Sequence, residues 1–209
     1  HMRVSFITVD EAHGISQWGY DFRPSYLEIA FIRKLLPHVP VLALTATATP
    51  KVIEDIQDKL SRSVPRKFNV FKMSFERKNL VYVVREAPDK REQLLHILSR
   101  LPGTAIVYAR SRQRTKEVSE MLNQTGISAT FYHAGLDSSV KDERQQTWQD
   151  GKTRVMVATN AFGMGIDKPD VRLVIPIDCP DSIEAYFQEA GRAGRDGKRS
   201  YAVLLYNDA

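Results

Sequence analysis

The chain has 209 residues, 43% of them hydrophobic and 26% charged, an ordinary composition for a globular protein of one large or two smaller domains. The formal net charge of +5 permits binding to a polyanion without demanding it, and the single cysteine, Cys179, excludes an intrachain disulfide. No apolar run approaches the roughly 20 residues of a membrane span, so we expect no membrane partner.

The first third of the chain predicts two strands, two helices and a connector. In chain order we predict a strand over residues 4–9, a helix over 24–36, a strand over 41–46, a helix over 49–60 and a polar, basic connector over 61–79. Pro24 and Thr49 suit the starts of the two helices, Thr49 as the N-cap. Leu27, Ala30 and Phe31 recur at helical spacing and support the first helix.

The rest of the chain continues the alternation of short apolar runs with amphipathic segments. We predict strands over residues 80–85, 104–109, 128–132, 154–159, 171–177 and 200–206, and helices over 89–101, 111–124, 138–150 and 181–191. This order indicates an α/β fold of parallel sheets with helices on both faces. Ligand sites of such sheets lie beyond the carboxyl ends of the strands, where most of the candidate residues fall.

Two carboxylates follow the first predicted strand in the sequence VDEAH. Asp10 at a strand end can hold Mg²⁺, mainly through water, and Glu11 can polarise an attacking water, as in phosphate-loop NTPases. A solvated Asp–Glu pair is the competing interpretation, and the pair alone favours it. The adjoining Ala12 and His13 shift the balance toward function.

Threonines and glycines follow two other predicted strands. Thr45 and Thr47 in LTATATP either cap a helix or couple the acidic residues to another segment through hydrogen bonds. Gly163 and Gly165 in ATNAFGMGIDKPD permit close approach of the backbone to an anion, although a long turn is the simpler explanation.

Arginines cluster in two places. Arg192 and Arg195, flanked by glycines in QEAGRAGRDG, suit a clamp on a transferring phosphoryl group, and a basic helix end is the alternative. Ser111 and Arg112 begin a predicted helix, whose N-terminus suits a nucleic-acid phosphate, and His133 in YHAGL follows the next strand. Exposed polar surface explains this second group equally well.

An aromatic-rich stretch, SQWGYDFRPSY at residues 16–26, comes directly after the acidic pair. Trp18 and Phe22 either pack over a core, as most aromatic side chains do, or form a platform on which unpaired bases stack. The stretch taken alone favours core packing.

These motifs, in this order, resemble superfamily-two helicases, and most closely the RecQ family of DNA helicases. The resemblance runs through VDEAHGISQWGYDFRPSY, ALTATATP, YHAGL, VATNAFGMGIDKPDVRLVI and YFQEAGRAGRDG, and it covers essentially the whole chain. Many RNA and DNA helicases share the DEAH box, whereas DEAH followed at once by the aromatic-rich stretch is far more specific to RecQ proteins.

The resemblance implies ATP and Mg²⁺ as cofactors, and single-stranded and duplex DNA as partners. It implies catalytic roles for Asp10, Glu11, Gln188, Arg192 and Arg195. It implies nucleotide binding by Asp10, Glu11, His13, Gly165, Asp167, Arg192 and Arg195. It implies DNA binding by Gln17, Trp18, Phe22, Arg23, Ser111, Arg112, His133 and Thr159, and coupling by Thr45 and Thr47.

The resemblance also implies RecA-like lobes, with residues 1–79 as part of lobe one plus the connector and residues 80–209 as lobe two. The phosphate-loop pattern GxxxxGK[ST] does not occur in the sequence, so we expect a helicase fragment whose native chain begins upstream of Arg3. Such a fragment would neither bind ATP tightly nor unwind DNA by itself. Its incomplete lobe would expose apolar surface and be mobile or self-associate.

The leading functional interpretation is the motor core of an ATP-dependent 3′-to-5′ DNA helicase that acts in unwinding, recombination and repair. Its compartment would be the bacterial cytoplasm or the eukaryotic nucleus. The alternatives are a non-catalytic nucleic-acid-binding module and the remnant of an RNA helicase.

Overall fold

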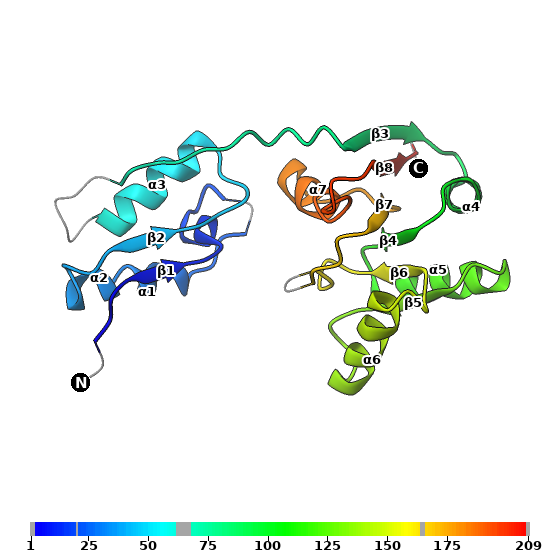
Figure 1. Ribbon diagram of the computed structural model, residues 1–209, viewed down its shortest axis with the longest axis horizontal. Coiled ribbons are helices and arrows are strands. Elements are labelled where there is room, and N and C mark those ends of the chain that lie inside the picture. Colours follow the sequence, from blue (N-terminus) through cyan, green and yellow to red (C-terminus); the bar gives the residue numbers. More distant parts are fainter. Residues whose placement is uncertain (1–2, 20, 62–67, 164–165, 208–209) are drawn as a thin grey trace. The chain divides into compact units, whose positions relative to one another are not determined.

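The computed structural model describes residues 3–19, 21–61, 68–163 and 166–207 (Figure 1). The chain divides into two compact units, unit 1 over residues 1–75 and unit 2 over residues 76–209. Each unit has its own parallel sheet and its own buried apolar residues.

Unit 1 is built on two parallel strands, β1 (Ile7–Val9) and β2 (Val41–Ala43). Both are shorter than the predicted strands. The 3-10 helix η1 (Ala12–Ile15) and the helix α3 (Pro50–Ser61) pack with these strands. The buried apolar residues are Val9, Ala12, Ile15, Val52, Ile56 and Leu60. The last three are four residues apart along α3, so they form one apolar stripe that faces the core.

The predicted single helix over residues 24–36 is wrong. The structure has two short helices there, α1 (Tyr26–Ile29) and α2 (Ile32–Leu35). The backbone N–H groups of Ala30, Phe31 and Arg33 each donate to the carbonyl three residues earlier, which is the tighter 3-10 pattern. This pattern does not keep residues at helical spacing on one buried face, and Phe31 is 60% exposed.

Unit 2 contains one six-stranded parallel sheet in the order β3-β8-β7-β4-β6-β5. The strands are β3 (Leu80–Glu86), β4 (Thr104–Tyr108), β5 (Ala129–Tyr132), β6 (Val155–Ala158), β7 (Val171–Pro176) and β8 (Ser200–Tyr206). The helices are α4 (Lys90–Arg100), α5 (Arg112–Gln124), α6 (Ser138–Gln149) and α7 (Ile183–Ala190). Each matches its predicted element to within two residues at either end.

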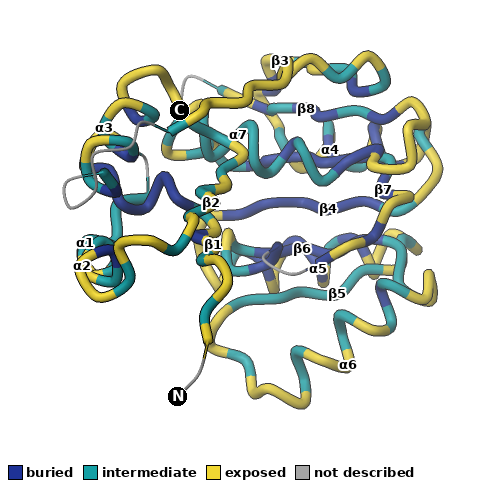
Figure 2. Tube along the Cα trace, turned by 60° about the vertical axis from the view of Figure 1, so that its left-hand side comes forward, coloured by how far each residue is buried: buried dark blue, intermediate teal, exposed yellow. Residues whose placement is uncertain are grey.

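Helices cover both faces of this sheet, which confirms the predicted α/β class. Successive residues of β4 point to opposite faces: Val107 belongs to the core under α4 and α5, and Ile106 to the core that includes Trp148 of α6. Figure 2 shows the central strands β4 and β7 buried along most of their length.

Side-chain caps begin three helices just past the carboxyl ends of strands. Asp89 accepts hydrogen bonds from two backbone N–H groups at the start of α4, and Ser111 and Ser182 each accept one at the starts of α5 and α7. These loops therefore present polar groups at the carboxyl edge of the sheet, where the predicted DNA contacts of unit 2 lie, whereas the loop with Arg192 and Arg195 precedes β8 and is bonded to the first residue of β7.

Candidate functional site

The acidic pair lies in a sharp turn at the carboxyl end of β1. Asp10 is exposed, and its Oδ1 accepts a 2.9 Å hydrogen bond from the Glu11 backbone N–H. Glu11 has φ 49° and ψ 42°, a left-handed conformation that costs a residue with a Cβ about 1–2 kcal/mol. The carbonyls of Glu11 and Leu44 accept 2.9 Å hydrogen bonds from Gly14 and Ala12, and these bonds hold the turn. The turn places both carboxylates beyond the strand end.

His13 joins this turn to the segment that follows β2. Its side chain is 2% exposed, and Nδ1 lies 3.0 Å from Thr45 Oγ1 and 3.4 Å from Glu11 Oε2. Burial lowers the pKa of His13, which favours the neutral ring at pH 7, while the nearby Glu11 opposes the shift. The Thr47 backbone N–H donates to the same Thr45 hydroxyl over 3.3 Å. The structure thus brings together the acidic pair, His13 and the two threonines.

The aromatic-rich stretch is fastened to η1. Trp18 is 62% exposed, and Lys51 Nζ lies 3.3 Å from the centroid of its ring. The Trp18 backbone N–H donates to Ser16 Oγ over 3.2 Å, and the Arg23 N–H donates to the Gly14 carbonyl over 2.9 Å. Core packing is therefore the wrong interpretation for Trp18.

The other predicted DNA contacts of this stretch differ in accessibility. Gln17 is exposed, whereas Phe22 and Arg23 are half-buried. Arg23 Nε lies 3.0 Å from Asp21 Oδ2, so its charge is compensated locally, and its guanidinium lies 5.5 Å from the Tyr26 ring centroid. Gln17 and Trp18 are the most exposed members of this group.

In unit 2, the loop that follows α7 brings Arg192 against the loop that follows β6. The Arg192 guanidinium donates to the Gly163 carbonyl. Gly163 has φ 149°, and a Cβ placed there would lie 2.1 Å from Arg192 Cζ. The φ angle at this position favours glycine, and a larger residue would also displace the Arg192 guanidinium from the backbone.

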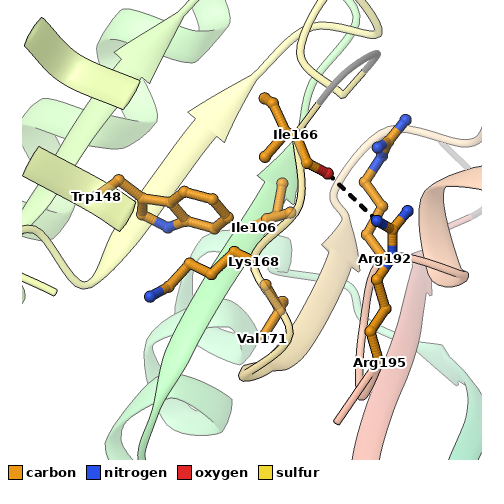
Figure 3. Close-up of a pocket in the computed structure, with 7 residues that line it drawn as sticks. All are labelled: Ile106, Trp148, Ile166, Lys168, Val171, Arg192 and Arg195. Carbon is orange, nitrogen blue, oxygen red and sulfur yellow. Dashed lines mark hydrogen bonds between the residues drawn. The ribbon is translucent and has the colours of Figure 1, made fainter. Parts of the chain in front are cut away.

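Arg195 lies beside Arg192 at a small pocket (Figure 3). Arg195 Nη1 lies 3.3 Å from the Ile166 carbonyl and 3.3 Å from Asp167 Oδ1. The pocket is also lined by Ile106, Trp148, Lys168 and Val171. The structure therefore groups the predicted Arg192, Arg195 and Asp167, whereas the predicted Gly165 lies outside the described residues.

Glu189, which the sequence reasoning missed, lies next to this group. Its Oε2 is buried and has no hydrogen-bond partner among the described residues. Burial raises the pKa of Glu189 to about 7, and Arg192 opposes the shift. The predicted Gln188 precedes it on α7 and is half-buried. The sequence feature that could have indicated Glu189 is its position beside two arginines in EAGRAGR.

The predicted DNA contacts of unit 2 lie at the carboxyl ends of three neighbouring strands. Because the sheet order is β4-β6-β5, the residues after these strands are side by side: Ser111 and Arg112, then Thr159, then His133. The Thr159 backbone N–H donates to the Tyr132 carbonyl over 3.1 Å.

Arg112 and His133 form the basic part of this edge. A Cβ at Gly135 would lie 2.6 Å from Arg112 Nη1, so the guanidinium covers the turn after His133. Burial lowers the pKa of His133, and Arg112 and Arg144 add to the shift. Arg110 and Arg114 are compensated by Asp181 and Asp178, at 3.0 Å and 3.1 Å, whereas no carboxylate of the described residues pairs with Arg112.

The described residues show neither a membrane span nor a cluster of metal-ligating side chains. In these ranges no helix is both long and apolar enough to cross a membrane, and no three His, Cys, Asp or Glu side chains gather as they would around a metal ion. Mg²⁺ in nucleotide sites is commonly held by one or two carboxylates together with phosphates and water. The exposed Asp10 and the adjacent Glu11 fit that arrangement.

Comparisons with known proteins agree with the sequence resemblance. The helicase conserved C-terminal domain matches residues 89–197, just over half of the chain. The ATP-dependent DNA helicase RecQ of Pasteurella multocida is 44% identical over 210 residues, which cover 100% of this chain and 33% of that protein. The RecQ-like DNA helicase blm-1 of Caenorhabditis elegans is 46% identical over 206 residues, covering 95% and 20%. The chain thus spans a third or less of these relatives.

A solved structure shares the fold. It is that of Saccharomyces cerevisiae Dbp5 bound to RNA and ADP BeF3, with a TM-score of 0.74 at 20% identity, covering 98% of this chain and 54% of that one. At this identity the likeness bears on the fold alone, and it confirms the predicted RecA-like architecture. The chain belongs to the family of helicases that share the conserved C-terminal domain, and within it to the RecQ helicases.

Proposed function

We propose that this chain forms the DNA-sensing and phosphate-clamping parts of an ATP-dependent DNA helicase motor. One arrangement carries the proposal: η1 is joined at its start to Glu11 and at its end to Ser16, so four residues separate the acidic turn from the aromatic-rich stretch. Both sides contact η1, the acidic turn through the 3.4 Å approach of Glu11 Oε2 to His13 Nδ1 and the aromatic-rich stretch through the Arg23–Gly14 hydrogen bond. A base stacked on Trp18 would therefore shift a segment that is connected through η1 to the carboxylates of Asp10 and Glu11.

The roles proposed for the site residues follow from their positions. Asp10 would hold Mg²⁺, mainly through water, and Glu11 would orient the attacking water. Bound ATP would supply the phosphoryl group for this attack. Arg195 is the better arginine finger, because Arg192 is committed to the Gly163 carbonyl while Arg195 makes longer contacts and is 40% exposed. Thr45 and Thr47 would couple the two kinds of site through His13.

Each unit offers groups that would contact single-stranded DNA. Trp18 and Gln17 offer a stacking face and a polar group in unit 1, and base stacking of this kind tolerates any sequence. In unit 2, Arg112, His133, Thr159 and the capped start of α5 at Ser111 offer donors to the phosphate backbone.

A chimaera tests the motor function. The matching segment of the Pasteurella multocida relative is replaced by this chain, and DNA-stimulated ATP hydrolysis and separation of 3′-tailed duplexes are measured. We expect both activities, and we expect Arg195→Ala to lower ATP turnover at least about a hundredfold, because arginine fingers contribute factors of that order or more. Lys116→Ala, an exposed change on α5, is the matched control. An Arg195→Ala chimaera with unchanged turnover would contradict the proposal.

The chain by itself should neither bind ATP tightly nor unwind DNA, because its sequence holds no phosphate loop to cradle the β- and γ-phosphates. Nucleotide titration of the 209-residue chain checks this expectation. An inactive chimaera, together with single-strand binding by the chain, would favour the non-catalytic module. Greater stimulation of the chimaera by RNA than by DNA would favour the RNA helicase.

We further propose that unit 1 self-associates through the outer face of its sheet. Leu42 and Leu44 alternate with the inward-facing Val41 and Ala43, and with Phe6 they leave an exposed apolar face. Analytical ultracentrifugation should show a concentration-dependent dimer that Leu42→Lys abolishes, while Leu35→Lys on α2 leaves it unchanged. A monomer at all concentrations contradicts this proposal.

We place the protein in the bacterial cytoplasm or the eukaryotic nucleus, which cell fractionation in the source organism would check.

A further inference from the structure

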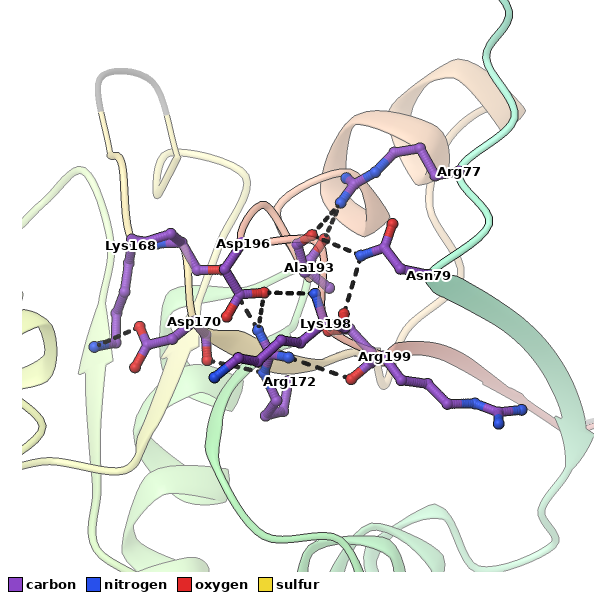
Figure 4. A network of polar contacts seen from close by, with 12 residues as sticks. Arg77, Asn79, Lys168, Asp170, Arg172, Ala193, Asp196, Lys198 and Arg199 are labelled. Carbon is purple, nitrogen blue, oxygen red and sulfur yellow. Dashed lines mark hydrogen bonds and ion pairs between the residues drawn. The ribbon is translucent and has the colours of Figure 1, made fainter.

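Arg77, the second residue of unit 2, binds the loop that carries the two arginines (Figure 4). Arg77 Nη1 donates to the Gly191 carbonyl over 2.9 Å, and Nη2 donates to the carbonyls of Ala193 and Gly194 over 2.8 Å and 2.7 Å. Carbonyls at a helix end lack partners within the helix, and a cation suits the negative end of the helix dipole. One guanidinium therefore satisfies three carbonyls where α7 ends.

Asn79 reinforces the same contact from two residues further along. Its side-chain Nδ2 donates to the Gly194 carbonyl over 2.7 Å and to the Lys198 carbonyl over 3.0 Å. The Asn79 backbone carbonyl accepts a 2.9 Å hydrogen bond from the Ser200 backbone N–H. Gly194 has φ 63°, and a Cβ placed there would lie 2.6 Å from Asn79 Nδ2. The start of β3 and the arginine loop are therefore packed too closely for any side chain at Gly194.

The carbonyls that Arg77 holds belong to the peptide groups around the arginines. The Gly191 carbonyl is part of the peptide group that leads into Arg192, and the Gly194 carbonyl is part of the one that leads into Arg195. The orientation of these planar groups sets where each arginine side chain leaves the backbone. Arg77 thus influences the direction of the Arg192 and Arg195 side chains without itself contacting the phosphate groups that these two arginines would bind.

Arg77 lies near the end of the connector, at the start of unit 2. Residues 69–76 form no helix or strand and are exposed, and Arg77 is the first half-buried residue after them. The residue that binds the arginine loop therefore lies between this exposed segment and β3, which begins at Leu80.

We propose that Arg77 is a positioning residue, which fixes the backbone on both sides of Arg192 and Arg195 and links their placement to the connector. The proposal rests on the proposed function of the two arginines in ATP hydrolysis. A helix cap of purely structural value would change the stability of unit 2 and leave the turnover of folded molecules unchanged. A positioning residue changes turnover in molecules that remain folded.

The first experiment uses the 209-residue chain and needs no activity. Amide resonances of Arg192, Gly194 and Arg195 are compared in ¹H–¹⁵N spectra of the wild type, Arg77→Ala, Arg77→Lys and the control Lys78→Ala, an exposed neighbour. We expect shifts at these three amides in Arg77→Ala, smaller shifts in Arg77→Lys and none in Lys78→Ala. Unchanged amides in Arg77→Ala would overturn the proposal. If Arg77→Ala does not fold, Arg77→Lys and Asn79→Ala answer the same question.

The second experiment measures ATP hydrolysis by the chimaera with the same substitutions. We expect Arg77→Ala to lower kcat about 10- to 100-fold without raising KM, because small misplacements of a group that acts in the transition state have effects of this size. Arg77→Lys should recover part of the loss, since lysine keeps the charge and three donors but lacks the rigid fork. Lys78→Ala should match the wild type.

An Arg192→Ala, Arg195→Ala double variant of the chimaera separates the two proposals. If the double variant keeps its turnover, the proposed function fails, whatever the spectra show. If the double variant loses turnover while Arg77→Ala keeps a normal kcat, the proposed function stands and the positioning role is overturned.

Discussion

Glu189 is held in surroundings that favour its protonated form. Burial raises the pKa of this carboxyl from its ordinary value of 4.5 to about 7, Arg192 opposes the shift and Asp181 adds to it. Burial therefore raises the pKa of Glu189 by more than the neighbouring Arg192 lowers it. The structural sign of this imbalance is the buried Oε2, to which none of the described residues donates a hydrogen bond.

This imbalance predicts how the stability of unit 2 depends on pH. Between about pH 4.5 and 7 the unfolded chain releases a proton that folded Glu189 retains, so the free energy of unfolding falls as the pH rises and is level above about pH 7. Glu189→Gln should remove this fall and stabilise unit 2 at pH 8 by at most about 3 kcal/mol. Urea unfolding, followed by Trp148 fluorescence in a Trp18→Phe background, measures it.

The matched control for this prediction is Glu184→Gln, which removes a carboxylate from the first turn of the same helix. It should not stabilise the unit at pH 8, because a negative charge there favours the helix. Equal stabilisation by both substitutions would show that the burial of Glu189 is not the cause.

Lys51 covers one face of the exposed Trp18 ring, with Nζ 3.3 Å from the ring centroid. Binding of single-stranded oligonucleotides to the chain should weaken roughly 5- to 150-fold in Trp18→Ala, because base stacking contributes about 1–3 kcal/mol. Lys51→Ala should mainly reduce the salt dependence of binding, since it removes a charge. Fluorescence anisotropy measures both effects.

Phe71→Ala is the control for the loss of an exposed aromatic side chain, because Phe71 lies in the connector and is fully accessible. The stacking role of Trp18 is refuted if Phe71→Ala and Trp18→Ala weaken binding equally.

At the scale of elements, α7 has only eight residues and depends on contacts at its two ends. Ser182 accepts a 3.0 Å hydrogen bond from the Ala185 backbone N–H at its start, and Arg77 binds its last carbonyls. Ser182→Ala should lower the stability of unit 2 by about 1 kcal/mol, or about 3–5 °C in Tm. Differential scanning calorimetry measures the change. Ser139→Ala, at an exposed position on α6, should change Tm far less, and equal losses would contradict the capping role.

The elements of unit 2 could be predicted from the sequence because apolar runs mark its strands, and capping residues such as Asp89, Ser111 and Ser182 mark helix starts. The segment 24–36 could not, because its apolar spacing fits a helix while its backbone makes the tighter 3-10 bonds. The grouping of Asp10, His13 and Thr45 follows from strand ends that meet at one edge of a sheet. The contact of Arg77 with Gly191 spans 114 positions, and no local pattern reports such a distance.

At the scale of the whole molecule, unit 2 contains every strand of the six-stranded sheet and both of its cores. We therefore expect residues 76–209 to fold without unit 1 and to unfold in one cooperative transition, as small single domains usually do. Circular dichroism and Trp148 fluorescence should report the same midpoint. Two separate midpoints would show that the unit does not fold as one domain.

A shorter variant, residues 80–209, tests what the start of the unit contributes. It keeps the sheet but lacks Arg77 and Asn79, which make five hydrogen bonds to carbonyls after α7. We expect it to fold with a lower midpoint than residues 76–209. Equal midpoints would show that these bonds do not stabilise the unit.

The pairing of β3 with β8 has a mechanical consequence. The first and last strands of unit 2 run parallel and are in register over seven residues, from Leu80 opposite Ser200 to Glu86 opposite Tyr206. Tension applied between the connector and the carboxyl end of β8 pulls the two strands in opposite directions along their length. The ladder is then sheared, with all of its hydrogen bonds resisting at once, and is not peeled apart one bond at a time.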